Sequence, residues 1–160
     1  MKNKKLLTAR VILTVLTVAA IVAIFYNSSL DAFESTEQSS PITEWINSIL
    51  ASLHFPFTLS ESFVRKAAHF CEYTVLGLLL SSTVYLYRKN KKKTMLTALP
   101  IGASVAVCDE LIQLFPAGRS YQLSDMLIDC CGIAFGTLIV LLIVLMIEKG
   151  RVKRERVISK

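Results

Sequence analysis

The sequence predicts an all-α, polytopic membrane protein with four transmembrane helices and a short outer interfacial helix. Hydrophobic residues make up 53% of the 160 residues and charged residues 19%, with a mean hydropathy of +0.53. Soluble domains carry about 25% charged residues. The apolar residues gather in four segments of about 20 residues, the length that crosses a hydrocarbon core of about 30 Å. This excludes a soluble globule, a disordered chain and a small disulfide-stabilised secreted domain. We predict a single membrane domain over residues 1–160.

The predicted spans cover residues 6–26, 63–87, 95–115 and 126–147. Arg10 lies about one turn inside the first span, close enough for its guanidinium to snorkel to the headgroups. The lysines before this span resemble the start of a signal peptide. However, its apolar run exceeds the usual 7–15 residues and no small-x-small cleavage site follows, so we expect an uncleaved anchor. In the third span, Pro100 marks a place where the helix begins or kinks.

The distribution of basic residues predicts the orientation in the membrane. Four spans place both termini on one side, and that side carries 15 of the 18 basic residues, including those of a tail over residues 148–160. The other side carries three basic residues and ten of the 12 acids. By the positive-inside rule, both termini are cytoplasmic. The net charge of +6 therefore reflects topology and attraction to anionic lipids, and we expect no nucleic-acid partner.

The segment between the first two spans divides into two parts. Residues 27–40 are polar and rich in Ser, which predicts an exposed loop. From Pro41, an apolar helical face predicts an amphipathic helix over residues 42–54, formed by Ile42, Trp45, Ile46, Ile49, Leu50 and Leu53. This helix is too short to span, so we expect it at the outer interface with Trp45 at headgroup depth. Two roles for this helix stay open: it packs against the bundle, or it forms a lid over a neighbouring site.

Ionisable residues cluster at the outer ends of the last three spans. The positions are Arg65, Lys66, His69, Glu72 and Tyr73 in the second span, Asp109, Glu110 and Gln113 in the third, Asp125 and Asp129 at the start of the fourth, and Arg119 in the loop between. A buried ion costs at least about 2.5–3.5 kcal/mol in a bilayer. We therefore expect these side chains to be one another's partners, in a functional site or in a structural network.

The residue types indicate roles for this cluster. The candidate catalytic residues are His69, Glu110 and Asp125, with His69 as general base, oriented by Glu72 or Glu110, and Asp125 as acid or metal ligand. The candidate ligand-binding residues are Lys66, Glu72, Tyr73, Asp109, Gln113, Arg119 and Asp129. No serine-nucleophile motif or His-Glu-x-x-His spacing is present, so the reaction class stays open.

The sequence assigns no metal ligands and identifies no cofactor. Two weaker alternatives are a Cys/His zinc site and a hard-cation site built from Glu110, Asp125 and Asp129. The four cysteines lack CxxC spacing and are expected to be buried thiols that pack as small hydrophobes; they are Cys71, Cys108, Cys130 and Cys131. Gly132 and Gly136 have the GxxxG spacing that allows close helix approach, which we expect within the monomer.

Two blocks of sequence resemble the VanZ-like family. Residues 65–77 are similar to its "K-x-x-H-x-x-E-Y-x-x-L-G" signature, and residues 109–125 to its "D-E-x-x-Q-x-F-x-P-G-R-x-x-x-x-x-D" block. Asn27-Ser28-Ser29 after the first span is also similar. The family usually has Asn four residues after the last Asp, where this chain has Asp129. The resemblance implies a small bacterial membrane protein of the type linked to lowered susceptibility to teicoplanin-like glycopeptides. It assigns no chemical role to the matching residues.

Several functions are compatible with these observations. In the first, the protein contributes to glycopeptide or lipoglycopeptide resistance or to envelope homeostasis. Its outer-leaflet site would then bind a lipid-linked or anionic ligand, with Lys66 and Arg119 holding a phosphate or carboxylate. In the second, it is an intramembrane enzyme acting on a lipid or cell-wall precursor, with His69 as base. The third is a lipid transporter or flippase, and the polar network could instead be purely structural. The expected partners are membrane lipids, a lipid-linked cell-wall precursor or a glycopeptide, in a bacterial cell membrane.

Overall fold

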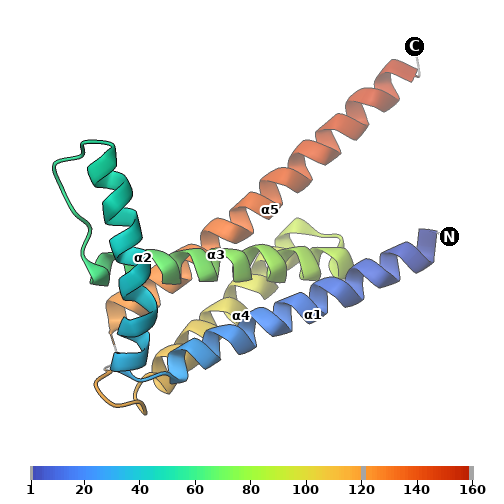
Figure 1. Ribbon diagram of the computed structural model, residues 1–160. Coiled ribbons are helices and arrows are strands. Elements are labelled where there is room, and N and C mark those ends of the chain that lie inside the picture. The colour runs from blue at the N-terminus through green and yellow to red at the C-terminus, as the bar shows by residue number, and fades with distance from the viewer. Residues whose placement is uncertain (1, 120–121, 159–160) are drawn as a thin grey trace.

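The computed structural model describes residues 2–119 and 122–158. Within them the chain forms five α-helices: α1 (Lys2–Ser29), α2 (Ala32–Ser52), α3 (Glu61–Arg88), α4 (Lys91–Ile112) and α5 (Leu123–Ile158) (Figure 1). Helices α1, α3, α4 and α5 are each long and apolar enough to cross a membrane. The predicted all-α architecture with four spans is therefore confirmed.

Helices α3 and α5 form the closest contact of the bundle, and glycines make it possible. A Cβ at Gly132 would lie 2.7 Å from the carbonyl oxygen of Phe70, and a Cβ at Gly77 would lie 2.5 Å from that of Ile133. Gly136 meets the backbone of α3 in the same way, at Thr74. The GxxxG spacing thus serves close packing within the chain, as expected.

A small core lies where α1, α3, α4 and α5 meet. Its buried residues are Ile24, Tyr73, Leu76, Val105, Ala106 and Ile133. Most other apolar side chains of the spans are exposed on the outside of the bundle, for example Val22 at 60% and Met146 at 72%. The cysteines are free thiols, and all except Cys130 are exposed. The expectation that they are buried is wrong for those three, because a four-helix bundle leaves one side of each span facing lipid.

Helix α2 begins at Ala32, so the prediction of an exposed loop over residues 27–40 is wrong for most of that stretch. A capping box starts the helix: Asp31 Oδ1 accepts from Glu34 N at 2.8 Å, and Glu34 Oε2 accepts from Asp31 N at 3.1 Å. Two orphan backbone N–H groups are satisfied in this way. The helix then continues through Pro41. It therefore begins ten residues before the predicted amphipathic segment.

Helix α2 runs across the end of the bundle (Figure 1) and buries some of its small polar residues there. Ser35 and Thr43 are buried, and Ser39 Oγ donates to Glu61 Oε1 of α3 at 2.7 Å. Part of the predicted apolar face points outward, with Trp45 66% exposed and Leu53 62% exposed, whereas Ile46 and Leu50 are half-buried and Ile42 borders the space between α2 and α3. A helix in water would show the opposite arrangement, whereas a helix at a membrane interface turns its apolar side to lipid.

The remaining boundaries differ modestly from prediction. Helix α4 begins at Lys91, where the Asn90 side chain caps it, and continues through Pro100 to Ile112. Helix α5 continues through most of the predicted basic tail, as far as Ile158. Arg10 of α1 is fixed more firmly than simple snorkelling implies, because its Nη2 donates to the Leu86 carbonyl at 3.1 Å.

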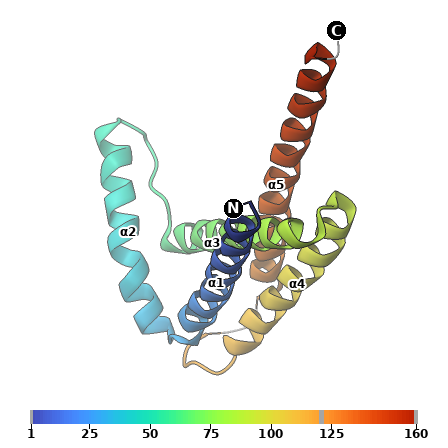
Figure 2. The same cartoon turned by 90° about the vertical axis from the view of Figure 1, so that its right-hand side faces the viewer.

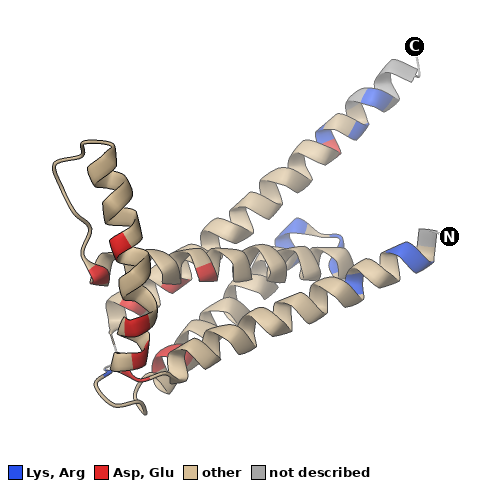
Figure 3. Cartoon of the chain, viewed as in Figure 1, with Lys and Arg blue, Asp and Glu red and all other residues tan. Residues whose placement is uncertain are grey.

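The charges separate along the bundle. Lys and Arg lie mainly at the end that carries both termini, whereas Asp and Glu lie mainly at the opposite end (Figure 3). We call this second end, where α3 and α5 begin and α4 ends, the acidic end. Figure 2 views the bundle from the side of the termini. At the basic end, Lys91 of α4 forms an ion pair with Glu148 of α5.

Candidate functional site

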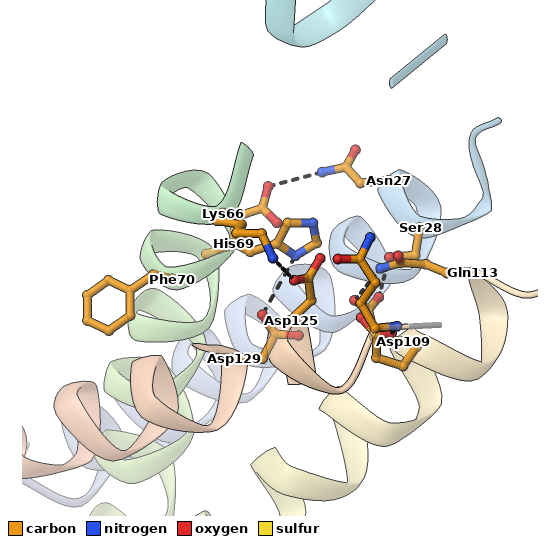
Figure 4. Close-up of polar contacts among 12 residues, drawn as sticks. Asn27, Ser28, Lys66, His69, Phe70, Asp109, Gln113, Asp125 and Asp129 are labelled. Atoms are coloured by element: carbon orange, nitrogen blue, oxygen red, sulfur yellow. Dashed lines mark hydrogen bonds and ion pairs between the residues drawn. The ribbon is translucent and has the colours of Figure 1, made fainter. Parts of the chain in front are cut away.

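The polar residues singled out in the sequence meet at the acidic end (Figure 4). Because the spans alternate in direction, the first turns of α3 and α5 lie beside the last turns of α4 and α1. Asp109, Glu110 and Asp129 are completely buried there, with 0% exposure. Tyr73 is also completely buried, and it belongs to the apolar core beneath these groups. The structure thus brings carboxylates from two helices into one enclosed region.

Asp109 is held by hydrogen bonds from two directions. Ser28 Oγ of α1 donates to one carboxylate oxygen, and Gln113 Nε2 donates to the other at 3.3 Å. In addition, Asn27 Nδ2 donates to Glu72 Oε1 at 3.2 Å. Asn27 and Ser28 were not predicted to belong to the site. The sequence does contain an indication of their place: they are two polar residues directly after an apolar span, which puts them at the depth of the cluster.

Lys66 and Asp125 form an ion pair between α3 and α5. Ser124 completes the group, because its Oγ accepts from Lys66 Nζ at 3.1 Å and donates to Asp125 Oδ1 at 2.9 Å. A ligand that binds Lys66, as predicted, would therefore have to compete with Asp125 of the same chain. Asp125, predicted as a catalytic acid, is likewise engaged by Lys66 and Ser124.

Glu110 joins the end of α4 to the chain that enters α5. Its Oε2 accepts a hydrogen bond from the backbone N–H of Gln122 at 2.9 Å. Its Oε1 is buried and has no hydrogen-bond partner among the described residues. The hydrogen bond to Gln122 fixes the position of the Glu110 carboxylate, and the second oxygen stays available to accept a hydrogen bond from another group.

His69 lies between the carboxylates of two other helices. Its Nδ1 is 3.7 Å from Asp129 Oδ1, too far for a hydrogen bond. One possible ligand atom from each of His69, Asp109 and Asp129 lies within 4.8 Å of the other two. Neither oxygen of Asp129, nor Nδ1 of His69, has a hydrogen-bond partner in the part of the chain that the structure describes.

Two cavities open above this group, and they share Arg65, His69 and Arg119. The smaller, of about 80 Å³, lies between the start of α2, the α4–α5 connection, α3 and α5. The larger, of about 170 Å³, lies between α2 and α3. Its lining mixes polar side chains with apolar ones such as Ile42 and Val64. The combined space therefore offers positive charge next to an apolar wall.

Arg65 and Arg119 supply that positive charge. Arg119 Nη1 donates to the Ser28 carbonyl at 3.5 Å, but neither arginine forms an ion pair with a carboxylate among the described residues. Burial, followed by repulsion from Arg65, lowers the pKa of Arg119, and nearby Asp109 and other carboxylates oppose this. The guanidinium remains charged all the same. Arg65 and Arg119 thus place two partly buried cations on the walls of cavities that Asp125 and Glu72 also line. Arg65 belongs to the cluster predicted from the sequence, but no role was predicted for it.

With this geometry established, the family can be assigned. The model of the VanZ/LLP1 family matches residues 13–145, which is most of the chain. The chain belongs to the VanZ/LLP1 family. The match spans the site as well as the bundle, and it confirms the resemblance seen in the two sequence blocks. No curated protein and no solved structure matches the chain.

In this VanZ/LLP1 chain, every side chain predicted for the site lies at the acidic end, although not in one contact group. Asp109, Asp129 and His69 lie together, Lys66 pairs with Asp125, and Glu110 and Glu72 each bond to a neighbouring segment. Ser124, Gln122 and Arg65 join them from outside the predicted set. The catalytic and ligand-binding roles given to these residues remain predictions.

Proposed function

We propose that this VanZ/LLP1 protein binds the anionic group of a lipid-linked molecule at the outer leaflet. The observation that carries the proposal is the pair Arg65 and Arg119, which line both cavities without a carboxylate partner among the described residues. Guanidinium groups bind phosphate and carboxylate with two parallel hydrogen bonds. A bound phosphate would also relieve the repulsion between the two arginines.

The surroundings of this pair favour an amphiphilic ligand over a free anion. The larger cavity has Ile42, Val64 and Ala68 on its wall, and the apolar side of α2 continues outward from it. An acyl or prenyl chain can lie along this surface while its phosphate reaches the arginines. The charge separation along the bundle supports an orientation with the acidic end outside and both termini in the cytoplasm.

This binding supplies a route to the physiological role. Glycopeptides act on the outer face of a bacterial membrane, where lipid-linked cell-wall precursors are exposed. A protein that holds such a precursor by its phosphate would change its accessibility to the drug. We therefore propose that the chain lowers glycopeptide or lipoglycopeptide susceptibility, or maintains the envelope, in a bacterial cell membrane.

The direct test is binding of a polyprenyl phosphate to the purified chain in lipid nanodiscs. We expect Arg119→Ala and Arg65→Ala each to weaken binding about 10-fold to 100-fold, because each removes a charge-assisted contact of about 1.5–3 kcal/mol. Arg151→Ala is the matched control, since Arg151 is exposed at the basic end. Wild-type affinity in both site variants would refute the proposal. In cells, the same variants should restore teicoplanin susceptibility at unchanged protein abundance.

A second candidate is an intramembrane enzyme that acts on the same class of ligand. The observation that favours it is the position of His69, which lines both cavities and faces Asp129. An imidazole between a ligand pocket and a buried carboxylate has the arrangement of a general base. Chemical conversion of the bound polyprenyl phosphate by the wild-type chain would distinguish this candidate from simple binding.

A further inference from the structure

We propose that His69, Asp109 and Asp129 together bind a divalent transition-metal ion, Zn²⁺ or Mn²⁺. The three residues come from α3, α4 and α5. They are far apart in the sequence. They share only Asp129 with the hard-cation set of Glu110, Asp125 and Asp129 considered from the sequence. The helices bring them together only because α3 and α5 begin where α4 ends.

The distances suit a shared ion with small side-chain adjustments. The three possible ligand atoms lie within 4.8 Å of one another, and His69 Nδ1 is 3.7 Å from Asp129 Oδ1. Two ligands of a tetrahedral ion, bonded at about 2.0–2.1 Å, are roughly 3.3 Å apart. The observed separation exceeds that value slightly and exceeds a hydrogen bond clearly. The atoms are thus spaced as ligands of one ion and not as direct partners.

The unsatisfied atoms point to the same conclusion independently. Asp129 is completely buried, and neither of its oxygens has a hydrogen-bond partner among the described residues. His69 Nδ1 is buried and equally unpartnered there. Buried polar atoms without partners are rare, and each one in a native protein needs an explanation such as a missing ion. A single cation held by His69 and Asp129 would give these unpartnered atoms a partner, with Asp109 close enough to join them.

Charge and donor chemistry indicate which ion. One imidazole and two carboxylate ligands together contribute two negative charges to a bound metal, which a divalent cation cancels. The nearest lysine, Lys66, is paired with Asp125 instead. Imidazole favours transition metals and carboxylate favours harder ions, so the mixed set selects Zn²⁺ or Mn²⁺ over Ca²⁺. Ser28 and Gln113 hold Asp109 in place by hydrogen bonds, as outer groups commonly do for metal ligands.

The ion would also bear on the ligand site. His69 lines both cavities, so a metal on it lies next to the space between Arg65 and Arg119. If the proposed function holds, the ion adds a third positive group for the phosphate of the lipid. This last step rests on the proposed function, whereas the metal site itself does not.

The test uses the metal alone. Purified wild-type chain in nanodiscs, stripped with EDTA and dialysed against Zn²⁺ or Mn²⁺, should retain about one ion per chain. Asp129→Asn and His69→Gln should each weaken binding at least about 100-fold. Asp129→Asn replaces a buried, unpartnered carboxyl group with a neutral isostere, so the metal-free variant should unfold at or above the temperature of metal-free wild type. Glu37→Gln, which changes an exposed carboxylate on α2 outside the triad, should still retain one ion per chain.

Two results would overturn the metal site. One is a wild-type chain that retains no ion after dialysis, and the other is Asp129→Asn and His69→Gln variants that retain it as well as wild type. The lipid assay separates this proposal from the previous one. Arg119→Ala should keep the ion while losing polyprenyl phosphate, so a loss of the ion in that variant would also count against the assignment.

Discussion

Asp129 is a carboxyl group that is buried without hydrogen-bond compensation among the described residues. It is completely buried, its carboxylate oxygens lack hydrogen-bond partners among the described residues, and its nearest potential counter-charge is His69 at 3.7 Å. Asp125, one turn earlier, is paired with Lys66 and braced by Ser124. Two carboxylates on one helix therefore have different tasks: Asp125 joins helices, whereas Asp129 is left to interact with something else.

The Lys66–Asp125 pair gives a prediction at this scale. Lys66→Met leaves the buried Asp125 without its cation, which should destabilise the protein by about 1–3 kcal/mol, less than the 3–5 kcal/mol of a fully buried pair because Lys66 is partly exposed. The double variant Lys66→Met/Asp125→Asn should recover most of the loss. Thermal unfolding in nanodiscs measures both. A double variant no more stable than Lys66→Met alone would show that the pair is not the source of the effect.

At the scale of elements, the contact between α3 and α5 depends on missing side chains. Gly77, Gly132 and Gly136 bring the two backbones so close that a Cβ on any of them would meet backbone atoms of the other helix. Backbone atoms cannot move aside as a flexible side chain can. This contact positions Asp129 relative to His69, so the packing of the bundle and the geometry of the site depend on the same glycines.

We predict that Gly136→Leu lowers the abundance of the folded protein severely, because the leucine side chain would overlap the backbone at Thr74 and Leu78. Gly150→Leu is the matched control on the same helix, since nothing lies within 4 Å of a Cβ at that position. Leucine has a higher helix propensity than glycine, so helix propensity alone would favour both variants. Size-exclusion chromatography of the two variants measures the difference. Equal yields of monodisperse protein would contradict the importance of this contact.

The elements also show how far the sequence could be interpreted alone. The spans were predictable because length and hydropathy suffice to identify them. The first ten residues of α2 were not predictable as a helix, because their polar composition resembles that of a loop. The capping box of Asp31 and Glu34 nevertheless starts the helix there. The members of the acidic cluster were predictable from the cost of intramembrane charge. Their pairing was not, because it depends on how each helix is rotated about its axis, which the tight α3–α5 contact decides.

At the scale of the whole molecule, the chain has two electrically distinct ends. Basic residues surround the termini and the α3–α4 connection, and carboxylates dominate the opposite end. Helix α2 covers the acidic end, where Ser35 and Thr43 are buried and Trp45 is exposed. The positive-inside rule predicts an orientation in which the basic end meets anionic cytoplasmic lipids and α2 meets the outer leaflet.

This orientation is testable by labelling from outside the cell. In a background whose four cysteines are replaced by alanine, Glu37→Cys on α2 should react with a membrane-impermeant maleimide in intact cells, because Glu37 is exposed on the acidic side. Arg151→Cys should react only after the membrane is permeabilised. This labelling pattern is expected because the positive-inside rule places the Lys- and Arg-rich end in the cytoplasm. The reverse labelling pattern would show that the chain inserts the other way round.

Helix α5 has a consequence that depends on its length. Its 36 residues extend about 54 Å, well beyond the roughly 30 Å of hydrocarbon. Asp129 stands near one end of this uninterrupted rod and Arg154 near the other. A small change in the tilt of α5 at the acidic end is therefore magnified into a lateral displacement of the basic end. The length of α5 thus couples the cavities at the acidic end mechanically to the position of Arg154.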